Sequence, residues 1–599
     1  MSGFEDEYLP KEVQDFQHHE EPETDQKTFQ KQVNNLITTF NEYGNPFLDD
    51  CDDLLILHTR ECAEKGVINT LRNISKIGKQ QYEAYKNDVI QSRSKSIHDP
   101  IKRNQLPLLK TPRAKRDVKS QQLMCLRNEA NLFGRLYIAN QQRGGDLSVF
   151  FSHENQAHPP SISDYGKLRI GTKSELLKCF DVEENGQFVV PDTFDCKIFD
   201  GGALIHSLNS GSSVTFDDYA KTKFIPFLKH ELQQVDKRID VVWDQYLDGS
   251  LKESLREKRG SGIRVKVGPQ AKIPSKWNDF LLQNQNKTEL FEYLSDKVNE
   301  SRWFDGKAVY ITKGTEVISN HTPMDKCTQE EADSRMIVHI VHAIKEGCKK
   351  MLVQSGDTDV LVILIGHFFF LQQLCPEINL WLAFGNKNNT IMYSINQIAE
   401  KLGQRVCEAL PVFHAFTGCD TTSSFYRKGK RIAWNAWKCF ASITDVFYDI
   451  RHNPFQQLSE SVENFSLLEK FTIAMYDKGS TSVDINEARR EMFTKKSTGI
   501  ESIPPTKDAL LQHAKRAVYQ AGIWSTCYQN EPIYPNPQEF GWRVEEGKYV
   551  PLWMTLPEAS KACKELIKCG CKSSRGCTTC KCAKSGLRCT DLCSCSCER

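Results

Sequence analysis

The sequence predicts an α/β protein whose central sheet is flanked by helices. From about residue 188 to residue 402, short apolar runs alternate with segments of helical character, and this alternation is typical of α/β folds. Three of the runs end in aspartate, at Asp200, at Asp244 and at the pair Asp357 and Asp359. Ligands bind beyond the carboxyl ends of the strands in such sheets, so the pattern also indicates where a functional site lies.

The elements of this sheet are predicted in chain order. Cys196-Lys-Ile-Phe ends in Asp200 and precedes a helical Gly-Gly-Ala-Leu-Ile-His-Ser-Leu. Residues 240–243 end in Asp244 and precede a charged helix over residues 251–259. Residues 350–355 are a third candidate strand, which leads into Gly-Asp-Thr-Asp and another apolar run. Residues 378–385 are a fourth candidate strand, and residues 395–402 form a further helix.

The rest of the chain divides by composition, because 599 residues are too many for one hydrophobic core. Residues 102–119 hold seven basic residues and one acid, which indicates either a nuclear-import signal or a solvated linker. We expect an acidic disordered tail (1–26), a helical region (27–120), a helix and linker (121–187), the α/β domain (188–450), a second helical region with a connector (451–556) and a cysteine-rich tail (561–599).

The composition is that of a globular protein, with 39 % hydrophobic and 26 % charged residues. The net charge of +1 gives no overall bias toward nucleic acid. The acidic N-terminus lacks the apolar core of a signal peptide, and the longest apolar stretch, residues 360–374, is too short to span a bilayer. We therefore expect a soluble protein without membrane contact, whose twelve scattered cysteines are reduced thiols in the nucleus or cytosol.

The aspartates at the strand ends predict a cation site, since carboxylates gathered there repel one another unless a hard cation neutralises them. Mg²⁺ and Mn²⁺ are the natural candidates, and two such ions stabilise both oxygens of a phosphodiester displacement. Two further acidic elements can join: Glu330, Glu331 and Asp333 open a helix, and Asp420 follows an apolar segment over residues 410–416.

Each acid also has an ordinary interpretation. Asp420 can cap a helix, and Glu330 and Glu331 can favour a helix N-terminus electrostatically. Asp200 and Asp244 can be turn residues. The histidines His367 and His414 are interpreted as packing or surface residues.

The order and setting of the acids resemble the flap-endonuclease branch of the PIN-like nucleases. The likeness is clearest over residues 330–437, which hold Glu-Ala-Asp at a helix start, Ser-Gly-Asp-Thr-Asp after a strand, Phe-Thr-Gly-Cys-Asp and a basic Arg-Lys-Gly-Lys-Arg. Upstream, Phe199-Asp-Gly resembles the first metal aspartate of the family, and Val242-Trp-Asp resembles its next conserved segment. The resemblance covers about 250 residues.

This resemblance implies a PIN-like central sheet and a two-metal nuclease that hydrolyses DNA phosphodiesters, usually at junctions or flaps. Lys252 and Arg259, on one face of the helix expected after Asp244, resemble basic residues that the family directs at the scissile phosphate; the alternative is a solvated charged face. The metal-binding carboxylates implied for Mg²⁺ or Mn²⁺ are Asp200, Asp244, Glu331, Asp333, Asp357, Asp359 and Asp420.

Three positions depart from the family. Asp333 stands where the family usually has glutamate, and Thr421 stands in place of the tyrosine of its Gly-x-Asp-Tyr motif. The turn that would grip a DNA backbone reads Lys428-Gly429-Lys430, with only one of its two glycines. These departures affect duplex binding at that turn and leave the metal cluster intact.

The cysteine-rich tail predicts a zinc site. Nine thiolates can fill three tetrahedral sites if three sulfurs each bridge two ions. The spacing resembles the tesmin-type CXC domain, which implies a three-zinc cluster that binds DNA. Thr579 replaces the DNA-contacting tyrosine of that domain, so a protein-interaction or structural role is the alternative. The nine predicted ligands are Cys569, Cys571, Cys577, Cys580, Cys582, Cys589, Cys593, Cys595 and Cys597.

Three functions compete at this point. The first is a divalent-metal-dependent nuclease acting on DNA in the nucleus, with the zinc-cluster tail assisting DNA binding; the cytoplasm is the alternative location. The second is a catalytically inactive DNA- or chromatin-binding protein that keeps the nuclease fold. The third is a DNA-processing accessory protein derived from a transposable element, because the overall layout resembles chains spread by mobile elements.

Overall fold

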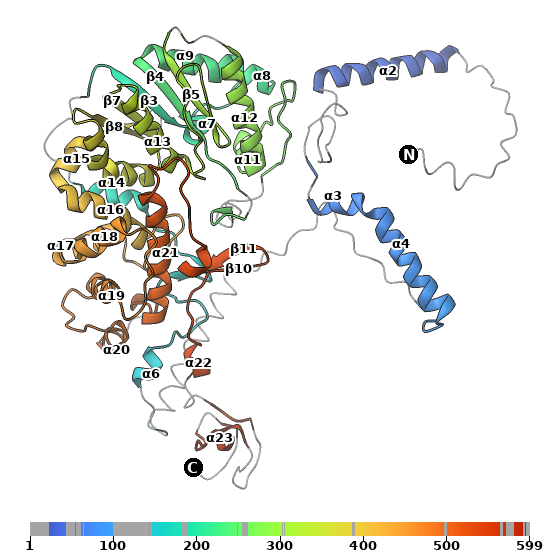
Figure 1. The fold of residues 1–599 in the computed structure, drawn as a ribbon. Coiled ribbons are helices and arrows are strands. Elements are labelled where there is room, and N and C mark those ends of the chain that lie inside the picture. The colour runs from blue at the N-terminus through green and yellow to red at the C-terminus, as the bar shows by residue number, and fades with distance from the viewer. Residues whose placement is uncertain are drawn as a thin grey trace. The chain divides into compact units, whose positions relative to one another are not determined.

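The computed structural model places the chain in two compact units (Figure 1). One unit comprises residues 1–110, 212–219 and 263–275, and the other comprises residues 111–211, 220–262 and 276–599. The structure describes residues 23–43, 54, 62–63, 65–99, 143, 147–180, 190–247, 249–253, 262–301, 304, 306–385, 390–495, 500–562, 567–570, 580–590 and 593–594.

The described part of the first unit is largely helical. Its helices are α2 (Glu23–Tyr43), α3 (Lys65–Arg72), α4 (Ile74–Tyr85), the π-helical η1 (Lys86–Gln91) and the short α8 (Phe216–Tyr219). No residue of α4 is buried. Tertiary packing, the usual source of helix stability in proteins, therefore contributes little to α4 within its own unit.

A seven-stranded mixed sheet forms the centre of the second unit, in the order β6-β5-β4-β3-β7-β8-β9. The five inner strands are parallel, and β6 and β9 pair antiparallel at the two edges. The predicted α/β fold with a central sheet is therefore confirmed. The strands are β3 (Phe194–Asp200), β4 (Val235–Val242), β5 (Ala308–Lys313), β6 (Glu316–Ser319), β7 (Lys350–Ser355), β8 (Asn379–Phe384) and β9 (Ile391–Ser394).

The register of the sheet brings the carboxyl ends of β4, β3 and β7 to one level. Asp200 at the end of β3 pairs with Val242 of β4, and Phe199 pairs with Gln354 of β7. Two helices begin at this edge, α7 (Gly201–Ser207) directly after β3 and α14 (Thr358–Leu374) after β7. The sheet thus places the ends of three neighbouring strands, and the helices that follow two of them, around one point.

Helices cover the sheet and continue into a helical layer (Figure 1). The apolar run after Gly-Asp-Thr-Asp forms α14, which is buried without interruption from Thr358 to Phe368, as expected for a helix that is apolar on all sides. One continuous core joins α14 to the helices beyond it. These helices include α13 (Ala332–Lys345), α15 (Ile395–Leu402), α16 (Gln404–Phe416), α17 (Lys430–Cys439), α18 (Ile443–His452), α19 (Glu463–Tyr476), α20 (Ile485–Lys495) and α21 (Lys507–Ser525).

A close contact beneath the strand ends fixes the start of α7. A Cβ atom added to Gly201 would lie 2.0 Å from Cε3 of Trp243. The Trp243 ring cannot move aside, because it stacks on Phe291 with ring centroids 4.3 Å apart and its Nε1 donates to Ser295 Oγ at 3.0 Å. Only glycine fits at this position, immediately after Asp200.

Gly201→Ala is therefore expected to lower the free energy of unfolding by about 1–3 kcal/mol, the usual cost of overpacking a rigid interior. Urea denaturation followed by circular dichroism measures this change. Gly356→Ala is the matched control, because an added Cβ there meets no atom within 4 Å. Equal stability of the two variants would show that Trp243 can shift after all.

Candidate functional site

Three adjacent strands deliver an acidic side chain to the same edge of the sheet. Asp200 is the last residue of β3, Asp244 follows the end of β4 by two residues, and Asp357 follows the end of β7 by two residues. Because β4, β3 and β7 are parallel neighbours, the three carboxylates converge. The sequence pattern of apolar runs ending in aspartate therefore corresponds to one place in the structure.

Some of these acids also cap helices. Asp200 Oδ1 accepts a hydrogen bond from the backbone N–H of Ala203 at 3.0 Å, and Asp357 Oδ1 accepts from the N–H of Asp359 at 2.9 Å. Asp244 Oδ1 accepts from the N–H of Ala332, the first residue of α13, at 2.9 Å. Helix N-termini favour negative charge, so the helix starts stabilise these three carboxylates, of which Asp200 and Asp244 have only a turn as their ordinary interpretation from the sequence.

A cavity of about 560 Å³ lies at this edge of the sheet. The structure brings all seven predicted carboxylates together around it: six line the cavity, and Asp359 is hydrogen-bonded to Asp357 behind them. Arg259 lies outside the described residues. The lining acids are Asp164, Asp200, Asp244, Glu331, Asp333, Asp357 and Asp420, and the lining basic residues are Lys167, Arg169 and Lys252.

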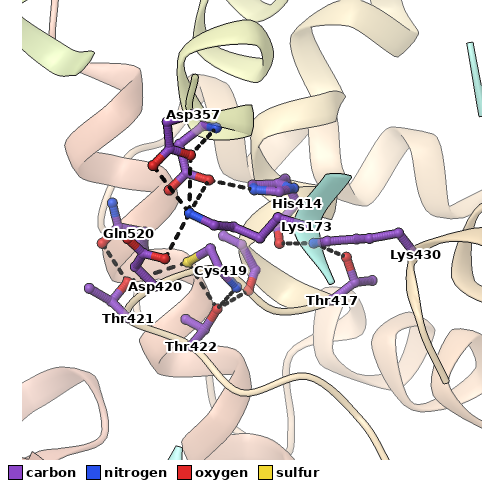
Figure 2. A network of polar contacts seen from close by, with 12 residues as sticks. Lys173, Asp357, His414, Thr417, Cys419, Asp420, Thr421, Thr422, Lys430 and Gln520 are labelled. Carbon is purple, nitrogen blue, oxygen red and sulfur yellow. Dashed lines mark hydrogen bonds and ion pairs between the residues drawn. The ribbon is translucent and has the colours of Figure 1, made fainter. Parts of the chain in front are cut away.

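Lys173 places an ammonium group at the centre of three of these acids (Figure 2). Its Nζ lies 3.1 Å from Asp357 Oδ1, 3.1 Å from Asp359 Oδ1 and 2.7 Å from Asp420 Oδ1. Burial disfavours its charged form, but the three carboxylates outweigh burial and raise the pKa of Lys173 far above its usual value. Oxygens of the same three acids all lie within 4.8 Å of one another, close enough to share one metal ion.

Lys252 is the second ammonium group in the site. It forms an ion pair with Glu331, and its Nζ lies 4.0 Å from Asp420 Oδ2. Its side chain is only 12 % exposed, so Lys252 does not belong to a solvated helix face. Burial opposes its charge, but Asp333 and Asp420 outweigh burial and raise the pKa of Lys252.

Negative charge remains in excess around the cavity. With Asp164 and Asp359 included, eight carboxylates less the four basic groups of Lys167, Arg169, Lys173 and Lys252 would leave four negative charges if every acid were ionised. Burial, reinforced by the charge of Asp244, raises the pKa of Asp200 to about 6. Burial also raises the pKa values of Asp333 and Asp357. Burial acts in the same direction on Asp359 and Asp420, but Lys173 and Lys252 outweigh it and lower the pKa values of these two acids.

Two residues of this network, Lys173 and His414, are not marked as site residues by any sequence motif. Lys173 lies in the 3₁₀-helix η2 (Lys173–Cys179), far from the acids in sequence, and no motif marks it. Burial lowers the pKa of His414 to about 4, so its ring is neutral at physiological pH and Nε2–H donates to Asp359 Oδ1 at 2.9 Å. His414 therefore contacts the site directly, and its position within the apolar segment of α16 conceals this.

Two of the positions that depart from the family pattern, Thr421 and Lys430, are buried. Thr421 Oγ1 donates to Gln520 Oε1 at 2.6 Å. Lys430 is 4 % exposed, and its Nζ donates to the backbone oxygen of His414 and to Thr417 Oγ1, both at 2.8 Å. Burial lowers the pKa of Lys430 to about 7. Its ammonium group faces the interior and is not presented to a DNA backbone.

The cysteine tail gathers four thiols in the part that the structure describes. The Sγ atoms of Cys569, Cys582, Cys589 and Cys593 lie within 4.8 Å of one another and could hold a metal ion. Cys580 Sγ lies 3.9 Å from Cys589 Sγ. Burial opposes ionisation of Cys593, but backbone N–H groups outweigh it and lower its pKa to about 7. The other four predicted ligands, Cys571, Cys577, Cys595 and Cys597, lie outside the described residues, as does Thr579.

Arg143 connects the tail to the chain before the sheet. Its guanidinium donates to the backbone oxygens of Ile567 at 2.9 Å and Arg588 at 2.6 Å. It also lies 3.5 Å from Cys582 Sγ. Among the described helices, none has the length and apolar character needed to cross a membrane.

No protein-family model matches the chain, and no curated protein matches it. Among solved structures, this chain is similar to the bacteriophage T5 D15 flap endonuclease in a pseudo-enzyme–product complex with DNA and metal ions. The sequence identity is 15 %, the match covers 55 % of this chain and 96 % of that one, and the TM-score is 0.24. A second structure, T5 D15 protein co-crystallised with metal ions, matches at 14 % identity over 55 % of this chain and 97 % of that one, with a TM-score of 0.25.

Proposed function

We propose that this chain is a divalent-metal-dependent nuclease that hydrolyses DNA phosphodiesters. The observation that carries the proposal is the convergence of the seven predicted carboxylates on one cavity, around which eight acids outnumber the four basic residues Lys167, Arg169, Lys173 and Lys252. Structural acids are usually neutralised one by one, whereas these acids keep an excess of negative charge. Such a site suits Mg²⁺ or Mn²⁺, which take oxygen ligands and bridge substrate phosphates.

The donor set fits two such ions. Asp357, Asp359 and Asp420 already surround a cation, the ammonium of Lys173, so their oxygens form a suitable site for the first ion. The acids on the β3 and β4 side, Asp200, Asp244, Glu331 and Asp333, are left for the second ion. When bound, the ions would lower the pKa of a water molecule and stabilise charge on the phosphate oxygens.

The chain's own residues supply binding and orientation. Ser355 Oγ donates to Asp200 Oδ2 at 2.9 Å, and His414 donates to Asp359. These hydrogen bonds hold acids at the strand ends in fixed orientations, as partners behind metal ligands generally do. Lys252, Lys167 and Arg169 line the same cavity and provide positive charge for the phosphates of a DNA strand.

A non-catalytic DNA-binding protein with the same fold is the second candidate. The specific observation in its favour is Lys173, whose ammonium stands where the first metal ion would bind. In such a protein the lysine ammonium would permanently take the place of the first metal ion, and the site would not cleave DNA. Cleavage by the purified protein separates the two candidates.

The test is cleavage of end-labelled flap, hairpin and single-stranded DNA by the full-length protein, with Mg²⁺, with Mn²⁺ and with EDTA. We expect products that require a divalent ion, and we expect the ion to raise the melting temperature because a ligand that binds the folded state stabilises it. A folded protein that binds DNA but cleaves none of these substrates would favour the non-catalytic candidate.

The tail is proposed to bind three zinc ions and to assist DNA binding. Residues 561–599 carry nine basic and three acidic residues, an excess of six positive charges, which would attract the DNA backbone in a salt-dependent way. Zinc–thiolate bonds would hold together a segment with little hydrophobic core of its own.

Cys582→Ser is expected to lower the zinc content by about one ion or more per chain, because a shared cluster loses a tetrahedral ligand. Elemental analysis after gel filtration measures the content. The matched control is Cys439→Ser, which changes an exposed free cysteine outside the tail. Unchanged zinc in Cys582→Ser would exclude this thiol as a ligand.

A further inference from the structure

A second cavity, of about 200 Å³, opens beside the carboxylate cavity. The two share Lys252 and Glu331 in their walls. The proposed reaction uses none of the other residues of this second cavity. They come from the loop after β4, the start of α13, the loop after α16, the helix α21 and the segment that follows α21.

One wall of the second cavity is aromatic. Tyr519 of α21, Tyr534 and Tyr549 of β11 (Lys548–Pro551) all line it. Phe455 holds two of these rings, with centroids 5.6 Å from Tyr519 and 6.1 Å from Tyr534. The Tyr519 hydroxyl donates to the backbone oxygen of Pro535 at 3.1 Å. At least two of the three rings are therefore fixed before any ligand arrives.

The start of α13 contributes polar groups to the same cavity. Gln329 is fully buried and Ser334 is 1 % exposed. Among the described residues, neither Gln329 Oε1 nor Ser334 Oγ has a hydrogen-bond partner. The orientation of the Gln329 amide is settled, because its Nε2 donates to the backbone oxygens of Cys527 and Gln529 at 3.2 and 2.5 Å. An unpaired acceptor and an unpaired hydroxyl at a cavity wall are costly unless a ligand pairs them.

We propose that this cavity binds a nucleobase of the substrate strand, turned out of its stack. A planar base can stack on fixed tyrosine rings, and its exocyclic amino group is the donor that Gln329 Oε1 lacks. Lys252, in the wall common to both cavities, would then lie near the phosphate that joins the bound nucleotide to the carboxylate cavity. The inference rests on the proposed function and adds a determinant of cleavage position to it.

The test uses the full-length Asp357→Asn/Asp359→Asn variant, so that bound DNA stays intact. Single-stranded oligonucleotides, each with one abasic site at a different position, are titrated by fluorescence anisotropy. We expect one position at which loss of the base weakens binding by about tenfold, the usual effect of losing one base–aromatic stack. At that position adenine, cytosine or guanine should bind better than thymine, which has no exocyclic amino group.

Tyr534→Ala, and separately Tyr549→Ala, should remove this position dependence and leave the binding of the abasic oligonucleotide unchanged. Tyr528→Ala is the matched control, because Tyr528 is 39 % exposed and does not line the cavity. An equal effect of abasic sites at every position, in a protein whose wild type cleaves DNA, would overturn the base pocket alone. A wild type that neither binds nor cleaves DNA would overturn the proposed function, and the pocket with it.

Discussion

Replacing Asp357 and Asp359 together by asparagine is expected to reduce metal-dependent cleavage by at least about 10³-fold, the scale on which loss of preorganised charge acts at a reacting phosphate. The two acids supply three of the oxygens that contact the Lys173 ammonium, which stands where the first ion is proposed to bind. Asparagine keeps the shape of each side chain and remains a good helix N-cap. The fold should therefore survive while affinity for the ion is lost.

Single-turnover cleavage in Mg²⁺ or Mn²⁺ measures the loss, and circular dichroism confirms that the double variant is folded. The matched control is Asp164→Asn, which removes an acid from the wall of the same cavity without touching the Lys173 contacts. It should retain activity within a few fold, since exposed charges at a site contribute modestly. Full activity in the folded double variant would place the catalytic centre elsewhere in the chain.

The positions of the strand-end acids could be predicted from the sequence because the pattern that marks them is local. An apolar run followed by aspartate shows both the strand and its end, so Asp200, Asp244 and Asp357 could be placed at one edge before the sheet order was known. Strands β5, β6 and β9 could not be predicted from this pattern, because none of them was recognised as an apolar run that ends in aspartate. The edge strands β6 and β9 have only four residues each, and such short runs cannot be distinguished from loops by periodicity.

Asp240 shows why a local pattern cannot identify a functional acid by itself. It begins the apolar run that ends in Asp244, yet it is fully buried within β4. Arg238 forms an ion pair with it, and His339 Nδ1 lies 2.6 Å from its Oδ2. Asp240 is neutralised by its own partners, whereas Asp244 lies past the strand end at a cavity. The difference is set by tertiary packing, which the sequence does not display.

The role of Lys173 could not be predicted from the sequence either, because it too is set by tertiary packing. Replacing Lys173 is expected to have the second large effect. Lys173→Met should tighten Mn²⁺ binding by about a hundredfold or more, because the metal no longer has to displace an ammonium held by three carboxylates. Each such contact is worth about 4 kcal/mol of Coulomb energy near a protein surface before desolvation is subtracted. The same change leaves the three acids without a neutralising charge, so the metal-free variant should melt at a lower temperature than wild type.

Isothermal titration with Mn²⁺ and melting curves with and without the ion measure both effects. The matched control is Lys178→Met, which removes a lysine of the same 3₁₀-helix whose exposed side chain pairs only with Glu175 among the described contacts. Tighter binding with faster cleavage at low metal concentration would identify Lys173 as a built-in cation that keeps the site closed until a divalent ion displaces it. Weaker binding in Lys173→Met would contradict the competition, and Lys173 would then be a permanent substitute for one ion, with the carboxylates serving a scaffold instead of a nuclease.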